Sequence, residues 1–273
     1  MIAFPPCKIN LGLFVTDKRP DGFHNIESIF LPVALYDVLE VIAADKGVIQ
    51  FNATGIKIEG KPEDNICLNA YKLLQRDFDL PGIKTHLHKC IPTGAGLGGG
   101  SSDGAFMLKL LNQIFHLQLH HNELMRYASQ LGSDCPFFID CTAKLVMGRG
   151  EILQQLEVDL KNWYVVIVHP GIHVSTATAY SKLKPKAATF SLEGINQIAK
   201  HEWKKTINND FEQSVSQEHP RISEIKVELY AQGATYVSMS GSGSAVFALF
   251  LSIPDSLSTH FAKDFYWSGK LLE

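Results

Sequence analysis

Apolar and polar residues alternate along the first part of the chain with the period of two that is typical of β-strands. Residues 7–15 (CKINLGLFV) place five apolar side chains on one face, and Lys8 and Asn10 begin the opposite face. A Pro-Asp-Gly turn is expected within residues 19–23. Residues 25–44 are again strand-like. The pattern predicts a strand with a polar patch at its start, a turn, and further strands.

A period near 3.6 predicts helices in residues 64–78, 101–115 and 121–132. A strand is expected in residues 83–91, before the second helix. Ser101 or Ser102 would cap that helix, and Asp103 would lie in its first turn. Gly132 would end the third helix, and residues 133–140 are expected to be a loop that enters another strand.

The later part of the chain mixes strands with a polar, helix-favouring stretch. Residues 163–171 (WYVVIVHPG) predict a buried strand, and residues 235–250 predict a strand, a glycine turn and a second strand. Strands mixed with paired helices indicate an α+β fold rather than regular βαβ units. The tail after Pro254 matches no pattern that we can interpret.

Composition narrows the class of protein. The 273 residues suit one large domain or two modest ones, and a net charge of −3 gives no basic field for nucleic acid. Five cysteines without a CxxC pair are typical of reduced thiols in a cytosolic protein. Because the sequence has no signal-peptide pattern and no apolar run of about 20 residues, we expect a cytoplasmic protein.

Residues 92–105 (PTGAGLGGGSSDGA) concentrate five glycines within seven positions, directly before a predicted helix. A tight turn needs only one or two glycines. The spacing also fits the G-x-G-x-x-G dinucleotide fingerprint, but a second helix follows where that fold needs a strand. The remaining interpretation is a phosphate cradle at a helix N-terminus. Since no P-loop lysine follows, Lys8 is a candidate for the positive charge.

These residues resemble the second motif of the GHMP kinases, the superfamily of galactokinase and of homoserine, mevalonate and phosphomevalonate kinases. Residues 239–249 (MSGSGSAVFAL) are similar to its C-terminal motif. The segments KINLGLFV, RPDGFHNIESIF, GSDCPFFI and HPG are similar to members that act in the non-mevalonate isoprenoid pathway.

The resemblance implies a two-lobed α+β fold. An N-terminal lobe like the ribosomal protein S5 domain 2 would comprise residues 1–155, and a ferredoxin-like C-terminal lobe residues 156–273. The active site would lie in the cleft between them. The protein is expected to be a monomer or a weak homodimer.

The implied reaction transfers the γ-phosphoryl group of ATP, accompanied by Mg²⁺, to the 2-hydroxyl of a cytidine diphosphate-linked methylerythritol. Asp134 would be the base or orient the hydroxyl, and Lys8 would be its electrostatic partner. The implied ATP-binding residues are Asn65, Pro92, Gly94, Gly96, Leu97, Gly98, Gly99, Gly100, Ser101 and Ser102. The implied substrate-binding residues are Asn10, Phe23, His24, Thr176 and Tyr180. A supporting loop would consist of Ser240, Gly241, Ser242 and Gly243.

Several of these residues have plainer interpretations. Asn65 could be a helix cap rather than a nucleotide contact. Phe23 stands where the family more often has tyrosine. A phenylalanine can still stack on a base, but it lacks the hydroxyl of tyrosine. Gly104 replaces an alanine and should weaken the first helical turn by up to about 1 kcal/mol. His86, His88 and Cys90 would share one face of a strand. Side chains spaced by two along one strand seldom converge on one metal ion. Cys135 has no evident partner for nucleophilic catalysis.

Two other functions remain open. The chain could be a GHMP kinase for another alcohol, such as homoserine or a mevalonate derivative, or a catalytically silent binding protein. Phe23 and His24 disfavour the first alternative, because they match the segment implied to hold cytosine. Lys8 and Asp134 disfavour the second, because a silent protein has no need of a catalytic pair.

Overall fold

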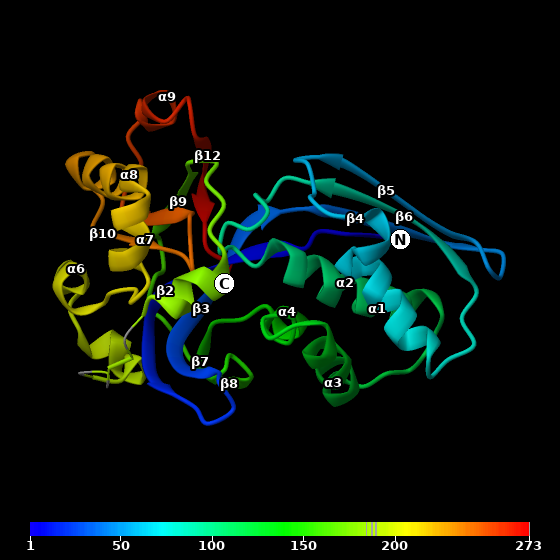
Figure 1. Cartoon of the computed structure of the whole chain (residues 1–273). Helices are drawn as coiled ribbons and strands as arrows, with labels where there is room; N and C mark the ends of the chain where they lie inside the picture. Colours follow the sequence, from blue (N-terminus) through cyan, green and yellow to red (C-terminus); the bar gives the residue numbers. More distant parts are fainter. Residues whose placement is uncertain (184, 187, 189, 273) are drawn as a thin grey trace. The chain divides into compact units, whose positions relative to one another are not determined.

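The computed structural model describes residues 1–183, 185–186, 188 and 190–272. These residues form two compact units (Figure 1). Unit 1 comprises Met1–Cys7, Leu35–Thr93 and Gly98–Cys141; unit 2 comprises Lys8–Ala34, Gly94–Leu97 and Thr142–Glu273. Since neither unit is one continuous segment, the boundary expected between residues 155 and 156 stays a prediction. Among the described residues, no helix is long and apolar enough to cross a membrane.

Unit 1 is a four-stranded sheet with helices packed against it. The strand order is β1 (Ile2–Ala3), β4 (Val38–Ala44), β6 (Gly82–Lys89) and β5 (Ile49–Gly55), and only the β5–β6 pair is parallel. The helices are η1 (Pro62–Asp64), α1 (Ile66–Gln75), α2 (Gly99–Ile114), α3 (His121–Leu131) and α4 (Phe137–Asp140). Helix α2 contacts β4, and α1 and α3 pack against α2 (Figure 1).

Local chemistry explains where the helices of unit 1 begin and end. The side chain of Asn65 accepts the N–H of Cys67 at 2.9 Å and caps α1, so the capping interpretation of Asn65 is confirmed. Helix α3 begins with a capping box between His120 and Glu123. It ends at Gly132, and this end is the one that the sequence predicted.

The sequence predictions for the start of α2 and for residues 137–140 were wrong. Helix α2 begins two residues earlier than expected, and its N-cap is Gly98 with a left-handed φ of 71°. Ser101 and Ser102 therefore lie inside the first turn and do not cap it, and Asp103 lies beyond that turn. Residues 137–140, expected to be a loop, form the short helix α4.

Gly104 also lies deeper in α2 than the sequence suggested. It is buried, and a Cβ at this position would lie 2.9 Å from Cγ1 of Ile66. The missing side chain lets α1 approach α2 closely, which explains a glycine at a position where helix propensity favours alanine.

Unit 2 contains two sheets. The first has the order β2 (Pro6–Lys18), β3 (His24–Tyr36), β7 (Lys144–Gly148) and β8 (Ile152–Gln155), with the first two residues of β2 and the last two of β3 in unit 1. The second is antiparallel, with the order β10 (Tyr236–Met239), β11 (Val246–Phe250), β9 (Tyr164–His169) and β12 (Phe265–Lys270). The tail after Pro254 thus supplies β12 and the edge of this sheet.

Unit 2 also contains helical segments, some of which contact the second sheet. The helical segments are α5 (Thr176–Ser181), η2 (Leu192–Gln197), η3 (Lys200–Glu202), α6 (Trp203–Thr206), α7 (Glu212–Glu218), α8 (Pro220–Ala231) and α9 (Leu257–His260). Helix α8 begins with proline and buries Ile222, Ile225 and Leu229 at helical spacing in the core beneath β10 and β11 (Figure 1).

Candidate active site

Most glycines of the glycine loop (residues 94–102) are required by their own backbone conformation or by a close neighbour in the protein. Gly94, Gly96 and Gly98 have φ values of 64°, 79° and 71°, a region that side chains rarely adopt. A Cβ on Gly96 would lie 2.0 Å from the carbonyl oxygen of Ser240, and one on Gly99 would lie 2.8 Å from Cγ2 of Ile91. These four positions therefore require glycine for conformation or space.

Gly100 is different. Its φ is ordinary, it is exposed, and a Cβ added there would meet no atom within 4 Å among the described residues. It occupies the second position of α2, where N–H groups have no partner in the helix. A glycine with open space above a helix N-terminus leaves room for an external anion to approach the backbone.

Gly100 also lines a cavity of about 420 Å³ within unit 1. The walls come from the segment after β5, the start of α1, the end of β6 and the start of α2. The lining residues include Asn65, Lys89, Gly100 and Asp103. Asn65, which caps α1, thus also lines this cavity.

Three buried ionisable side chains meet at the end of β6, and two of them, Lys89 and Asp103, line this cavity. The sequence did not indicate that the three meet. The ammonium of Lys89 lies between the carboxylates of Asp37 and Asp103, the latter at 2.7 Å. The other oxygen of Asp37 accepts the N–H groups of Cys90 at 2.6 Å and Ile91 at 2.9 Å. The cluster fixes the end of β6 against α2.

The two acidic neighbours change the titration of this cluster. Burial alone would lower the pKa of Lys89, but the two carboxylates outweigh it and raise that pKa. Burial, with a contribution from Asp37, raises the pKa of Asp103 to about 8 despite the ammonium of Lys89. Oδ1 of Asp103 and Oγ of Ser102 are buried and have no hydrogen-bond partner among the described residues.

Asp134 lies half-buried in the turn between α3 and α4. Its neighbour Cys135 is fully buried and is hydrogen-bonded with the side chain of Ser101, in the first turn of α2. The predicted catalytic aspartate therefore lies in a turn that contacts the glycine loop. Burial raises the pKa of the Cys135 thiol to about 12, which agrees with a structural rather than nucleophilic cysteine.

Lys8 and Asn10 lie in unit 2, on the same face of β2. Lys8 is only 3% exposed, so it is not a solvated lysine at the end of a strand. Its ammonium donates to Oδ1 of Asn10 and stands 4.4 Å from the ring centroid of Phe30. Its backbone N–H donates to the carbonyl of Leu97 at 2.9 Å, so the strand is joined to the glycine loop.

The supporting loop (residues 240–243) also meets the glycine loop in unit 2. The hydroxyl of Ser240 donates to the carbonyl of Gly96 at 2.9 Å and accepts the N–H of Asn10 at 3.3 Å. The hydroxyls of Ser242 and Thr176 lie 2.9 Å apart. The structure thus brings together four of the predicted site features: β2, the glycine loop, Thr176 and the supporting loop.

The predicted cytosine-binding aromatics form two groups. Tyr180 stacks on His24 with ring centroids 5.0 Å apart and 22° between the planes, and Phe211 meets Tyr180 edge-on at 4.8 Å. Phe23 is 56% exposed, and the guanidinium of Arg149 lies 4.9 Å from its ring centroid. The sequence did not indicate Phe211 or Arg149. Their place near the site is evident only from their contacts with Tyr180 and Phe23 in the structure.

His86 and His88 have a simple role on the outer face of β6. Both rings lie 2.9 Å from the hydroxyl of Thr54 on the neighbouring strand. Cys90 lies beyond the end of β6. No cluster of three or more His, Cys, Asp or Glu side chains suited to a metal occurs in the part of the chain that the structure describes.

Known proteins resemble this chain in sequence and in fold. The families described as "GHMP kinases N terminal domain" and "GHMP kinases C terminal" match residues 65–141 and 191–264. A Bacteroides thetaiotaomicron protein named 4-diphosphocytidyl-2-C-methyl-D-erythritol kinase is 49% identical over 252 residues, which are 92% of each chain. A Parabacteroides distasonis protein of the same name is 46% identical over 99% of this chain and 100% of its own.

Solved structures confirm the fold. A crystal structure of 4-(cytidine 5'-diphospho)-2C-methyl-D-erythritol kinase matches with a TM-score of 0.86 and 30% identity over 99% of both chains. Mevalonate kinase of Methanococcus jannaschii matches with a TM-score of 0.71 and 15% identity over 100% of this chain and 98% of its own, a likeness in fold alone. The α+β kinase fold predicted from the sequence is therefore confirmed. The chain belongs to the GHMP kinases and, within them, to the 4-diphosphocytidyl-2-C-methyl-D-erythritol kinase family.

Proposed function

We propose that this chain transfers the γ-phosphoryl group of ATP to the 2-hydroxyl of 4-diphosphocytidyl-2-C-methyl-D-erythritol, a step of isoprenoid precursor synthesis. The observation that carries the proposal is Gly100, an exposed glycine at the start of α2 that no described neighbour requires and that lines the cavity of unit 1. The names of relatives at 46–49% identity support the choice of substrate.

Unit 1 would bind the nucleotide. The phosphates would accept hydrogen bonds from the N–H groups of the glycine loop and from the first turn of α2, where the helix dipole also favours negative charge. The base would enter the cavity beside Asn65. Ser102 would contribute a hydroxyl to the Mg²⁺ that accompanies ATP, since its buried Oγ has no other described partner. Mg²⁺ would neutralise charge on the phosphates.

Asp134 and Lys8 would act on the reacting groups. Phosphoryl transfer needs positioning, charge neutralisation and an acceptor for the proton of the attacking hydroxyl. The carboxylate of Asp134 would orient that hydroxyl or accept its proton. The ammonium of Lys8 would stabilise negative charge as it develops, and its contacts with Asn10 and Phe30 hold it in one place.

Unit 2 would bind the cytidine and the sugar alcohol. Phe23 exposes most of its ring and can stack on cytosine, while His24 and Tyr180 supply a second aromatic surface and polar atoms. Thr176 would contact a substrate hydroxyl, and Asn10 and the supporting loop would line the rest of the site. A GHMP kinase without a cytidine substrate has no need of these aromatics.

A coupled assay tests the proposal. Purified protein with ATP and Mg²⁺ should release ADP with 4-diphosphocytidyl-2-C-methyl-D-erythritol and not with homoserine or mevalonate. Asp134→Asn should lower kcat by about 10²- to 10⁴-fold and still bind ATP. ADP release only with homoserine or mevalonate would identify the first alternative, and ATP binding without turnover on any substrate would identify a silent binding protein. Normal turnover by Asp134→Asn would remove Asp134 from catalysis.

A further inference from the structure

One short segment of unit 2, residues 207–212 (INNDFE), contacts three separate parts of the proposed substrate site. No motif of the sequence analysis includes it. It begins after α6 and ends at the first residue of α7. Its contacts run to β2, to the supporting loop and to Tyr180.

The first contact is a short parallel bridge beside β2. The N–H of Leu13 donates to the carbonyl of Asn208 at 3.0 Å, and the N–H of Asp210 donates to the carbonyl of Leu13 at 2.9 Å. The side chain of Asp210 also accepts the N–H of Val15 at 2.9 Å. The segment is thereby aligned with the strand that carries Lys8 and Asn10.

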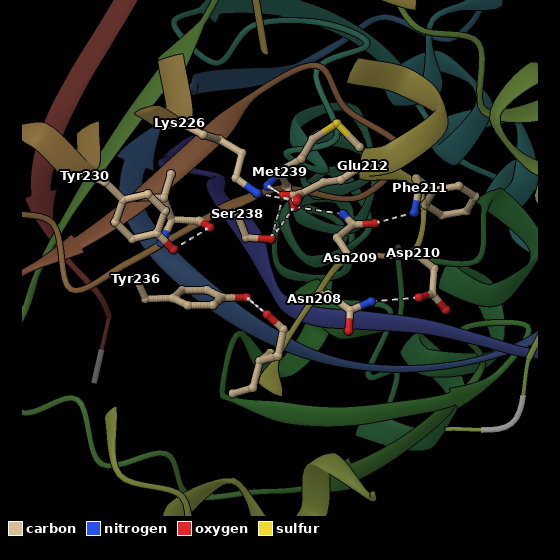
Figure 2. Close-up of polar contacts among 12 residues, drawn as sticks. Asn208, Asn209, Asp210, Phe211, Glu212, Lys226, Tyr230, Tyr236, Ser238 and Met239 are labelled. Atoms are coloured by element: carbon tan, nitrogen blue, oxygen red, sulfur yellow. Dashed lines mark hydrogen bonds and ion pairs between the residues drawn. The ribbon is translucent and has the colours of Figure 1, made fainter. Parts of the chain in front are cut away.

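The second contact is made by the side chain of Asn209, which is only 2% exposed as a residue. Its amide nitrogen donates to the carbonyls of Met239 and Gly241, both at 2.8 Å, and its oxygen accepts the N–H of Phe211 at 3.0 Å. Figure 2 shows this side chain among the polar contacts that surround Met239. One amide thus binds the carbonyls on both sides of Ser240.

Glu212 fixes the strand that leads into the supporting loop. Its carboxylate accepts the N–H of Met239 at 2.5 Å and the hydroxyl of Ser238 at 3.1 Å, and it pairs with Lys226 of α8 (Figure 2). The end of β10 therefore cannot shift without breaking bonds to this segment. The third contact of the segment is the edge of Phe211 against Tyr180.

The supporting loop needs such donors because of its shape. Gly241 and Gly243 have φ values of 56° and 91°, so the loop leaves the strand conformation at once after Met239. The carbonyl of Met239, just before the loop, and that of Gly241 within it both accept from the buried amide of Asn209. A buried carbonyl that loses its donor is left without a hydrogen bond, which favours loop conformations other than the present one.

We infer that Asn209 is a positioning residue of the phosphoryl-transfer reaction: its amide holds the supporting loop where Ser240 meets Asn10 and the glycine loop. The inference rests on the proposed function. Displacement of the loop would move Ser240 away from Gly96 and Asn10 and so disturb the site that orients the substrate. A misplacement of about 1 Å costs on the order of a hundredfold in rate.

The test compares Asn209→Ala and Asn209→Ser with the neighbouring Asn208→Ala. The Asn208 side chain donates to Asp210 and makes none of the contacts to the loop, so its removal is the matched control. Asn209→Ala should lower kcat about 10- to 100-fold, with less than a twofold change in the KM for ATP. Asn209→Ser should recover part of the loss, because a hydroxyl can donate to one of the two carbonyls. Asn208→Ala should keep wild-type kcat.

Two further measurements separate positioning from loss of stability. Amide hydrogen exchange of residues 241–243 should become faster in Asn209→Ala while β11 keeps its protection, a readout that needs no activity. Ser240→Ala combined with Asn209→Ala should lose little more rate than the worse single variant, because both act through one loop. Additive losses, unchanged exchange, or a lowered melting temperature with normal kcat would overturn the inference. A wild-type protein that fails the substrate assay refutes the proposed function instead.

Discussion

At the scale of single residues, Gly100 separates structural from functional use of glycine. Gly94, Gly96 and Gly98 serve backbone conformation, and Gly99 leaves room for Ile91. Gly100 satisfies neither need, although ordering a glycine costs more conformational entropy than ordering an alanine. The expected benefit lies outside the protein, in the close approach of phosphate oxygens to the backbone of α2.

Gly100→Ala should therefore change stability and nucleotide affinity in opposite directions. Alanine favours the helix by up to about 1 kcal/mol and meets no described atom within 4 Å, so the melting temperature should stay constant or rise. The added methyl group would occupy the approach to the helix N–H groups and raise the KM for ATP about tenfold or more. Thermal unfolding and steady-state kinetics measure the two effects.

Gly194→Ala is the matched control for this substitution. Gly194 lies in η2, has an ordinary φ, and has no described neighbour closer than 3.9 Å to an added Cβ. It should leave the KM for ATP unchanged. An unchanged KM in Gly100→Ala as well would mean that the phosphates bind elsewhere.

At the scale of elements, the buried ammonium of Lys89 ties β6 to α2. The high pKa of Asp103 means that the folded chain keeps a proton that the unfolded chain releases at about pH 4. Between about pH 4 and pH 8 the folded state thus binds more protons, and this group's contribution to the free energy of unfolding falls as pH rises. The contribution is complete below this window and lost above it.

Asp103→Asn should remove that pH dependence. Lys89 and the Cys67 thiol of α1, which also face Asp103, have raised pKa values and do not titrate within the window. Urea unfolding at pH 5 and pH 8.5 should show the variant gaining stability relative to the wild type at the higher pH. An equal difference at both pH values would mean that Asp103 is ionised throughout.

The types of elements could be predicted from the sequence, but several boundaries and contacts could not. The period of residues 99–114 shows a helix, yet its start depends on the left-handed φ of Gly98, which no side-chain pattern reveals. The strand alternation places Lys89 on the inward face, but the sequence does not reveal its partners. Asp37 and Asp103 are distant in sequence and meet Lys89 only in the folded chain. Asn209 looks like a polar loop residue until the carbonyls of residues 239 and 241 are in place.

At the scale of the whole molecule, the two units carry different parts of the proposed reaction. The cavity, the start of α2 and Asp134 belong to unit 1, whereas Lys8, the aromatic side chains and the supporting loop belong to unit 2. Because nucleotide and alcohol substrate would contact different side chains, substitutions in the two units should affect the two KM values separately.

Phe23→Ala tests this separation. Stacking of an aromatic side chain on a base contributes about 1–3 kcal/mol, so the KM for the cytidyl substrate should rise roughly 5- to 150-fold, while the KM for ATP should change less than about twofold. Phe23 exposes more than half of its surface, so the melting temperature should stay the same. Arg149→Ala, which leaves the ring and removes only the cation beside it, should have a smaller effect. If Phe23→Ala raised the KM for ATP more than that for the cytidyl substrate, the assignment of cytidine to unit 2 would be wrong, whatever the outcome for Gly100.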